Sequence, residues 1–377
     1  MSSRHQTGEA EVVVAGHICL DIIPTFNRGT GDLQTLLMPG KLTQVGPAVV
    51  STGGAVSNTG IALHRLGVRT WLMGKVGDDL IGHAILDVVR AVKPALADGM
   101  IIAKGESSSY TVVISPPATD RIFLHCPGAN DTFGVSDIVY KQLKGARLFH
   151  FGYPPLMRRM YAEGGKELES MFQGVRKRGL ITSLDMAMPG SSLGTGQPDW
   201  ISILKRILPF VDIFLPSLEE ILLLLNRKNQ DVNGSLLSEL SAQLLDWGAG
   251  MVVLKLGDQG LYVRTRESKF PGWKHRELLA PCFQVDVLGT TGSGDCTIAG
   301  FLAGFLRGLS PEDVMTAAVG VGASSCEKAD ATTGVPTWEN IQRRIRVGWK
   351  RLPLKFPLPD WRWDAQKKIW YGSNDQR

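Results

Sequence analysis

The sequence predicts an α/β protein with a mostly parallel central sheet, helices on both of its faces and a small β lid. Two observations lead to this prediction. The run Val12-Val13-Val14-Ala15 is apolar without alternation, as in a strand that is buried on both faces. Short apolar segments of this kind then alternate with helical patterns along most of the chain, which is typical of sheets covered by helices.

Composition and charge exclude several classes of protein. No apolar run approaches the roughly 18 residues of a membrane-spanning helix, so we expect no membrane partner. The net charge of +5 lies in the last 37 residues, which carry +7, while the rest of the chain sums to −2. The main body therefore gives no reason to expect nucleic acid. Five widely spaced cysteines and a polar N-terminus predict a cytoplasmic protein with reduced thiols.

Asp21 is the first candidate site residue. It follows the buried strand at 12–15 by a few residues, and open α/β sheets bind ligands beyond the carboxyl ends of their strands. A solvated turn aspartate would produce the same pattern, so the residue alone does not decide between the two interpretations.

A Gly-Gly pair marks the second candidate region. Gly53 and Gly54 precede a helical pattern that ends at Gly67, a residue type typical of helix C-caps. Asn58 lies in the first turns of this helix. A polar side chain this close to two glycines is better explained by a ligand than by an ordinary helix surface.

A small accessory sheet, or lid, is predicted from about residues 24–50 and 101–127, where prolines interrupt short extended segments. A turn at 116–120 separates two of these segments. The candidate strands of the lid are residues 36–38, 42–45, 110–114 and 121–124.

The remaining chain continues the alternation of strands and helices. We expect strands at 71–74, 147–151, 180–184, 211–215 and 251–256. We expect helices from residue 80 and at 156–178, 198–208, 217–225, 234–247 and 338–349.

One main domain at 11–340 is predicted, because the chain contains no internal repeat and no low-complexity linker. A flexible N-terminus at 1–10 precedes it, and a basic, Trp-rich extension at 341–377 follows it. Four tryptophans in the extension are too many for a disordered tail. They favour packing onto the main body over a partner-binding site.

The stretch 289–304, GTTGSGDCTIAGFLAG, is the most informative part of the chain. It begins as a Gly-rich turn and becomes a small-residue helix near Asp295. Backbone N–H groups and the helix dipole would favour an anion at this junction. An anion cradle beside a single carboxylate suggests phosphoryl transfer, although an ordinary Gly-rich turn remains the alternative.

Taken together, these motifs resemble the ribokinase-like sugar kinases, also called the phosphofructokinase B family, over about residues 11–340. The matching motifs, in chain order, are Gly53-Gly54-x-x-x-Asn58, Leu66-Gly67, Gly77-Asp78-Asp79, Gly128-Ala129-Asn130, Thr290-Thr291-Gly292-Ser293-Gly294-Asp295 and Gly300-Phe301. Each is weak alone, but their joint order and spacing are specific. The resemblance implies a three-layer fold with a β lid over the sugar. It also implies transfer of the γ-phosphoryl group of ATP, as its Mg²⁺ complex, to a substrate hydroxyl.

The resemblance also implies roles for individual residues. The catalytic base is matched by Asp295. The anion hole is matched by Gly292, Ser293 and Gly294. The sugar-binding positions are matched by Asp21, Gly53, Gly54, Asn58 and Asn130. The nucleotide-binding positions are matched by Ser217, Lys255, Gly257 and Gly260. The position that organises Mg²⁺ through water is matched by Glu220.

Three positions depart from the family pattern. Gly289 stands where the family usually has an Asp that helps to hold a monovalent cation, which puts potassium activation in doubt. Ser217 replaces the Asn of an Asn-x-x-Glu motif, and Lys255 replaces a Thr. Lys255 could lie along the phosphates or be a surface residue at a strand end, and the sequence leaves both open.

Three functions follow from these observations. The first is an ATP-dependent kinase of a sugar or a sugar-like polyol. The second is a nucleoside kinase of the same fold, for which Phe26, Tyr110 and Phe123 are candidates to stack on a base. The third is a kinase-derived protein that binds a sugar or a partner without turnover. The resemblance also makes a homodimer through the lid plausible.

Overall fold

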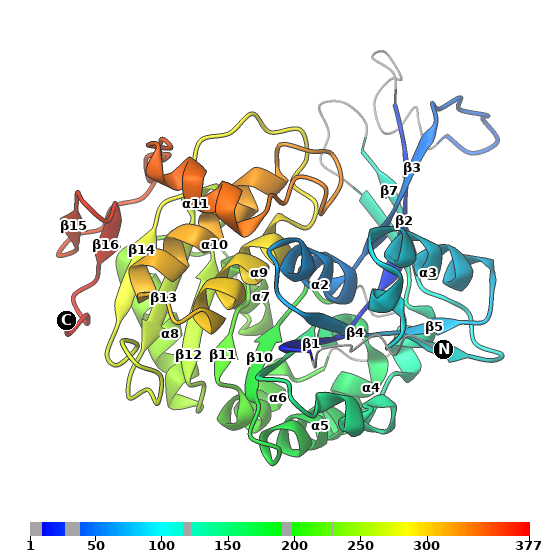
Figure 1. The fold of residues 1–377 in the computed structure, drawn as a ribbon, viewed down its shortest axis with the longest axis horizontal. Coiled ribbons are helices and arrows are strands. Elements are labelled where there is room, and N and C mark those ends of the chain that lie inside the picture. Colours follow the sequence, from blue (N-terminus) through cyan, green and yellow to red (C-terminus); the bar gives the residue numbers. More distant parts are fainter. Residues whose placement is uncertain (1–9, 27–37, 116–121, 191–197, 228) are drawn as a thin grey trace, which may run out of the picture.

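The computed structural model describes residues 10–26, 38–115, 122–190, 198–227 and 229–377. A long sheet crosses the molecule between two layers of helices (Figure 1). Its strands, in order across the sheet, are β15 (Arg362–Asp364), β16 (Ile369–Tyr371), β14 (Glu277–Ala280), β13 (Leu261–Thr265), β12 (Met251–Lys255), β11 (Ile213–Phe214), β10 (Ile181–Asp185), β9 (Leu148–Gly152), β1 (Val12–Gly16) and β4 (Thr70–Met73).

Pairing is parallel from β4 to β12 and antiparallel from β12 to β15. The prediction of a mostly parallel sheet flanked by helices is therefore confirmed. The predicted strands at 147–151, 180–184, 211–215 and 251–256 correspond to β9 to β12. The antiparallel strands β13 to β16 were not predicted.

Two separate hydrophobic cores lie on the two faces of the sheet. Strand β1, which is apolar on both faces, contributes to each of them. Val12 and Val14 belong to one core, whereas Val13 and Ala15 belong to the other. The helices over the first core are α2 (Ala55–Arg65), α3 (Leu80–Val92), α9 (Ser293–Leu306), α10 (Pro311–Ser325) and α11 (Trp338–Arg346). Those on the other face are α4 (Arg158–Tyr161), α5 (Lys166–Arg176), α6 (Trp200–Ile207), α7 (Leu218–Leu224) and α8 (Gly234–Asp246).

The predicted helix at 156–178 is interrupted. Its residues form α4 and α5, which are separated by a short irregular turn. Gly164 and Gly165 have φ values of 66° and 81° in this turn. A left-handed backbone cannot continue an α-helix, so the glycines explain the break.

A smaller sheet forms the lid at one end of the main sheet (Figure 1). Its strands, in order, are β3 (Ala48–Gly53), β2 (Cys19–Pro24), β7 (Tyr110–Ile114) and β8 (Ile122–Cys126). The predicted pair around 110–124 is thus present. Strand β6 (Ile101–Ala103), inside the predicted lid range, instead pairs with β5 (Lys75–Gly77) in a separate sheet.

Two further expectations for the lid need correction. Asp21 lies within the lid strand β2, because the chain turns into a second strand directly after β1. The candidate strand at 42–45 is wrong, since these residues are irregular and mostly exposed, and β3 is the strand that pairs with β2. Residues 1–9, 36–37, the turn at 116–120 and Arg121 lie outside the described residues.

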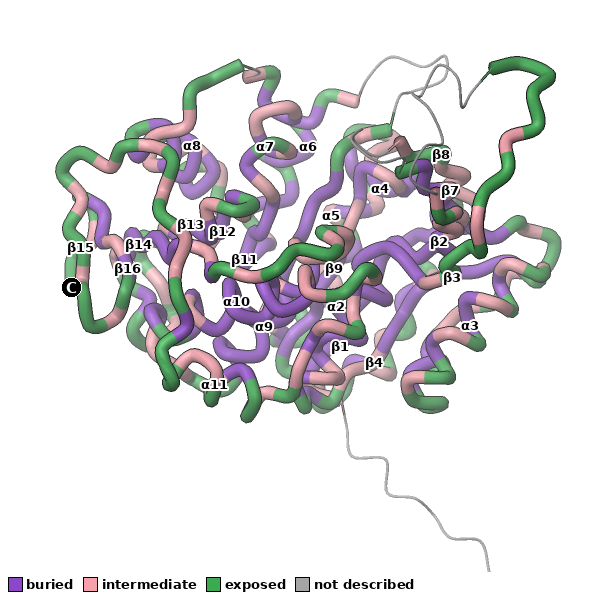
Figure 2. Tube along the Cα trace, turned by 90° about the horizontal axis from the view of Figure 1, so that it is seen from above, coloured by how far each residue is buried: buried purple, intermediate pink, exposed green. Residues whose placement is uncertain are grey.

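The segment after residue 340 packs onto the main body, as its tryptophans indicated. Strand β16 pairs with β14 and so extends the main sheet. Trp349 stacks on Phe283 with ring centroids 4.3 Å apart. At the end of the chain, Asp375 accepts a hydrogen bond of 2.8 Å from Arg276. The middle of the main sheet is largely buried, whereas parts of the hairpin of β15 and β16 are exposed (Figure 2). Within the described ranges, no helix is long and apolar enough to cross a membrane.

Candidate active site

A cavity of about 1090 Å³ lies at the carboxyl ends of the parallel strands. Its walls come from Tyr153 after β9, the start of α7, the turn after β12, the start of α9 and a segment near the C-terminus. The predicted site residues that line it are Ser217, Lys255, Gly257, Gly260, Glu220, Gly292, Ser293, Gly294 and Asp295. The predicted sugar-binding residues do not line this cavity, although Asn58 reaches its edge through Asp295.

The Gly-rich turn ends in the N-terminus of α9, as predicted. Gly292 is the N-cap of this helix, with a φ of 70°, and a Cβ atom here would meet the Cβ of Ala331 at 2.5 Å. Only glycine fits both the backbone and the space. Gly292 has no side chain that could cap the helix, and the Ser293 N–H donates to the Thr290 carbonyl at 3.3 Å. The N–H groups that follow it at the start of α9 would face an anion in the cavity.

Asp295 lies in the first turn of α9, and its carboxylate accepts hydrogen bonds from three side chains outside this helix. The Asn58 side-chain amide donates to Oδ2 at 3.1 Å, and the Tyr153 hydroxyl donates to the same oxygen at 2.7 Å. The Thr59 hydroxyl donates to Oδ1 at 3.2 Å. A carboxylate offers about four lone-pair positions. Donors from the described residues therefore occupy three of them, and one position on Oδ1 is left for a further donor.

Tyr153 has an unusual backbone conformation for its residue type. It follows β9 directly and has a φ of 69° and a ψ of 41°, in the left-handed region that side-chain-bearing residues rarely adopt. Such strain costs of order 1–3 kcal/mol and collects at functional sites. Burial, together with the nearby carboxylate of Asp295, raises the pKa of Tyr153 well above its usual value. Its hydroxyl therefore stays protonated and remains a donor to Asp295.

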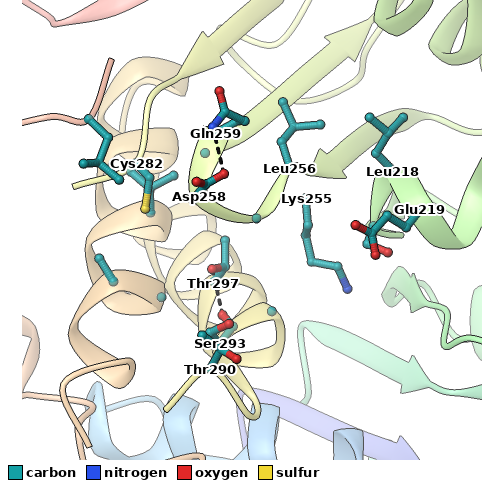
Figure 3. A pocket seen from close by; sticks show the side chains of 18 of the residues that line it. Leu218, Glu219, Lys255, Leu256, Asp258, Gln259, Cys282, Thr290, Ser293 and Thr297 are labelled. Atoms are coloured by element: carbon teal, nitrogen blue, oxygen red, sulfur yellow. Dashed lines mark hydrogen bonds between the residues drawn. The ribbon is translucent and has the colours of Figure 1, made fainter. Parts of the chain in front are cut away.

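Lys255 points into the cavity from the end of β12, between the starts of α7 and α9 (Figure 3). Its Nζ lies 2.6 Å from Oδ1 of the fully buried Asp185, and its side chain is 12% exposed. The surface interpretation of Lys255 is therefore wrong. Burial alone would lower its pKa, but the carboxylates of Asp185 and Glu220 outweigh burial and raise it. The side chain is thus a fixed positive charge.

Ser217 and Glu220 cap the start of α7. The Ser217 hydroxyl accepts a hydrogen bond of 3.1 Å from the Glu220 N–H, and Glu220 Oε2 accepts one of 2.7 Å from the Ser217 N–H. Ser and Thr are the typical first residues of such a capping box. The Ser that replaces the family Asn therefore has a structural role here, while Glu220 also lines the cavity.

Asp21 lies in the lid, close to the Gly-Gly pair. The Cys19 thiol donates to its Oδ1 at 3.3 Å, and a Cβ atom on Gly53 would lie only 2.3 Å from its Oδ2. Gly54, with a φ of 88°, passes equally close to the backbone of His17. Gly53 therefore allows β3 to pass close to Asp21 of β2, and Gly54 allows the start of α2 to lie against His17.

Asn130 does not present its side chain to a ligand. It is fully buried, its amide donates to the Ile18 carbonyl at 2.9 Å, and its Oδ1 accepts from the Ile18 N–H at 3.2 Å. The predicted direct sugar contact is corrected to a structural role, because both polar atoms fix the turn between β1 and β2.

Residues 9–338 match the pfkB family carbohydrate kinases. The chain belongs to this family. An uncharacterized sugar kinase of Archaeoglobus fulgidus is 28% identical over 277 residues, 73% of this chain and 98% of the relative. The 2-dehydro-3-deoxygluconokinase of Bacillus subtilis is 25% identical over 80% of this chain and 89% of its own length. A probable chloroplastic fructokinase-6 of Arabidopsis thaliana is 25% identical over 92% of this chain and 85% of its own length.

Solved structures confirm the ribokinase-like fold of this pfkB family member. A fructokinase with bound ATP from Xylella fastidiosa has a TM-score of 0.70 at 18% identity and covers 90% of this chain and 99% of its own. An Arabidopsis thaliana ribokinase complexed with ribose and ATP has a TM-score of 0.69 at 18% identity, with coverages of 89% and 98%.

Three residues of this candidate site escaped sequence reasoning: Thr59, Tyr153 and Asp185. Two of them stand at strand ends. In the register of the sheet, Gly152 of β9 is paired with Asp185 of β10, so Tyr153 and Asp185 lie at the same edge. The strands had been predicted at 147–151 and 180–184. Residues just beyond each predicted carboxyl end were therefore the signal that could have found them.

Asp21→Asn is expected to stabilise this kinase at neutral pH. Burial raises the pKa of Asp21 to about 6, so the folded state favours the protonated carboxyl. The stability contributed by that proton is present below about pH 4 and is lost as the pH rises through 6. An amide avoids the loss, so we expect about 2–3 kcal/mol more stability than wild type near pH 8 and little difference near pH 4. Calorimetric melting at both pH values measures this, and equal shifts at both would contradict it.

Proposed function

We propose that this protein transfers the γ-phosphoryl group of ATP to a hydroxyl of a sugar or sugar-like substrate, with Asp295 as the base. The observation that carries this proposal is the arrangement at the start of α9. Asp295 is fixed by three donors and keeps one lone-pair position for a substrate hydroxyl. It stands beside the Gly292–Gly294 backbone that is suited to an anion.

The backbone N–H groups of Gly292 and Gly294, and that of Ser293 when it leaves its 3.3 Å bond to the Thr290 carbonyl, would stabilise the charge on the transferring group. Phosphoryl transfer depends mainly on positioning and charge stabilisation, because there is little covalent chemistry for the protein to perform. A Cβ atom on Gly294 would lie 3.5 Å from Cδ of Lys255, so the lysine borders this cradle. An ammonium at this place would contact the phosphates together with the N–H groups.

The charges of the cavity fit a nucleotide that arrives with Mg²⁺. Among the residues that the structure describes, two ammonium groups line the cavity, those of Lys255 and Lys355. The lining carboxylates outnumber them and belong to Glu219, Glu220, Asp231, Asp258 and Asp295. A triphosphate would be repelled by this excess unless a divalent cation offset it. Mg²⁺ is commonly held by one or two carboxylates plus the phosphates, and Glu220 is placed to contribute through water. When bound, Mg²⁺ would neutralise charge on the phosphates.

On the other side of Asp295, Asn58 and Asp21 would bind hydroxyl groups of the substrate. Amide and carboxylate groups pair well with hydroxyls. His17, between β1 and β2, and His125, in the lid strand β8, lie near these residues. Burial is the main cause that lowers the pKa of both side chains, so the rings are neutral. A polyhydroxyl substrate fits this surrounding. The names of relatives, which include fructokinase and 2-dehydro-3-deoxygluconokinase, direct the choice of substrates.

The test is phosphorylation of a substrate panel by the full-length chain with ATP and Mg²⁺. The panel contains fructose, ribose and 2-dehydro-3-deoxygluconate, and products are identified by mass spectrometry. Adenosine belongs in the panel because the nucleoside kinase alternative predicts it as acceptor. Phosphorylation of a sugar supports the proposal. Tight sugar binding without a phosphorylated product would instead favour the non-catalytic alternative.

Replacement of potassium by sodium is expected to change the turnover by less than about twofold. Gly289 lacks the carboxylate that the family uses beside a monovalent cation. A Cβ atom here would meet the Ala329 carbonyl at 2.8 Å and the Lys328 carbonyl at 3.0 Å, so no side chain fits. Initial rates at constant ionic strength in KCl and NaCl measure this, and activation by potassium of fivefold or more would contradict it.

A homodimer through the lid remains part of the proposal. The lid strands expose Val49, Val50 and Leu124 at 41%, 51% and 55%. Exposed apolar side chains on one small sheet are a common feature of protein interfaces.

A further inference from the structure

A C-terminal segment runs along the cavity although it lies outside the residues that match the family. We call residues 348–361 the strap. Its first part is hydrogen-bonded to the segment that precedes α9. The Gln284 N–H donates to the Lys350 carbonyl at 2.9 Å, and the Leu352 N–H donates to the Cys282 carbonyl at 2.8 Å. Because Cys282 lines the cavity, the strap lies at the cavity wall.

The strap is fixed firmly at its beginning. The Trp349 ring stacks on Phe283, and its Nε1 donates to the Gln284 carbonyl at 2.8 Å. The Arg351 guanidinium donates to the Pro281 carbonyl at 2.6 Å and to the Thr316 hydroxyl at 3.0 Å. These contacts join the strap to α10 and to the loop after β14, so its position is determined by packing.

The middle of the strap is attached to the turn after β12, which borders the proposed nucleotide site. The Lys355 N–H donates to Oε1 of Gln259 at 2.6 Å, and the Lys355 ammonium forms an ion pair with Asp258. Farther on, Trp361 packs against Tyr262 with ring centroids 6.0 Å apart. The strap is therefore attached to the main body both before and after the residues that face the cavity.

Apart from Lys355, which is paired with Asp258, the residues that the strap contributes to the cavity are apolar. Leu352, Phe356 and Pro357 line the cavity together with Phe283 and other apolar residues near the strap. The lysine and carboxylate that would handle phosphates, Lys255 and Asp295, come from β12 and α9. A nucleotide has the same division, with charged phosphates at one end and an apolar base face at the other.

We propose that the strap forms part of the wall that holds the nucleoside portion of ATP, with Phe356 as its main contact. This inference rests on the proposed function, because it takes ATP as the occupant of the cavity. It assigns a nucleotide-binding role to a segment after residue 340. The strap and the turn after β12, which are joined through Lys355 and Gln259, would border the nucleotide together.

The test compares Phe356→Ala with Leu354→Ala in the full-length chain. Both side chains are half-buried and pack against the same hydrophobic cluster, but only that of Phe356 lines the cavity. Affinities for ATP and ADP, each with excess Mg²⁺ and without sugar, are measured by titration calorimetry. We expect Phe356→Ala to raise the Kd for both nucleotides roughly tenfold and Leu354→Ala to leave it within about twofold of wild type. Melting temperatures show whether the two variants are similarly folded.

Hydrogen exchange of the wild-type chain gives a second measurement that does not depend on a substitution. ATP is expected to slow the exchange of amides in residues 352–358, whereas those of the hairpin of β15 and β16 should be unchanged. Wild-type affinity in Phe356→Ala, or unchanged exchange in 352–358 with ATP bound, would overturn the role of the strap alone. Failure of the wild-type chain to bind ATP would overturn the proposed function and the strap inference together.

Discussion

Asp295→Asn is expected to lower kcat for the sugar substrate by roughly a thousandfold, since general base catalysis contributes between a hundredfold and ten-thousandfold. An amide cannot take the proton of the attacking hydroxyl. The Kd for ATP should change little, because the proposed nucleotide contacts lie on other residues. The effect should therefore appear in turnover and not in nucleotide binding.

The structure indicates that Asn fits at position 295 without disturbing its neighbours. Its amide oxygen can accept from Asn58 and Tyr153, as Oδ2 of Asp295 does. Its NH₂ group would then face the Thr59 hydroxyl, which can rotate and accept. Loss of activity would thus report the chemistry of residue 295 and not a loss of folding.

Tyr153→Phe is the matched control for this experiment. It removes one donor to Asp295 and keeps the carboxylate, so we expect a much smaller loss of kcat than for Asp295→Asn. Steady-state rates, with melting temperatures for each variant, make the comparison. If Asp295→Asn kept kcat within tenfold of wild type, the assignment of the base would be wrong.

The sequence predicted the site residues that belong to motifs. It did not predict the residues that hold those side chains in place by hydrogen bonds or ion pairs. Asp295 and Gly292–Gly294 could be found because the Gly-rich turn and the helix that follows it are contiguous in sequence. Tyr153 and Asp185 come from single strand ends with no surrounding motif, and a tyrosine in the left-handed region has no sequence signature. Their importance depends on the register of β9 and β10, which only the folded sheet determines.

A motif match also did not guarantee a ligand contact. Asn130 belongs to a family motif, yet its amide nitrogen and oxygen both bond to the Ile18 backbone. The sequence pattern records that an amide is needed at this position and does not show what the amide contacts.

The antiparallel strands β13 to β16 escaped prediction for a related reason. They are three to five residues long, and their pairing joins segments as far apart as residues 279 and 370.

Lys255→Met is expected to lower kcat/KM for ATP by roughly a hundredfold, in the range measured when one donor to a developing charge is removed. The ammonium is fixed at 2.6 Å from Asp185 and borders the Gly294 backbone. A charge held in place before the reaction needs little reorganisation when the phosphoryl group moves. Methionine keeps the length of the side chain and removes the charge.

The same substitution should also destabilise the fold, and this effect has to be separated from the loss of activity. Asp185 has no exposed side-chain surface, and in the described part of the chain its Oδ2 has no hydrogen-bond partner. Removal of Lys255 would leave this carboxylate buried and unpaired, at a cost of about 3–5 kcal/mol. The double variant Lys255→Met/Asp185→Asn removes both charges and should recover most of the stability.

The double variant decides between a structural and a functional role for Lys255. If the lysine only neutralises Asp185, the double variant should recover both melting temperature and kcat/KM for ATP. If the lysine acts on the phosphates, the melting temperature should recover while kcat/KM stays low. We expect the second result, because Lys255 lines the cavity between the starts of α7 and α9, where an anion would bind, whereas Asp185 does not line it. Full recovery of kcat/KM in the double variant would show that the ion pair is structural.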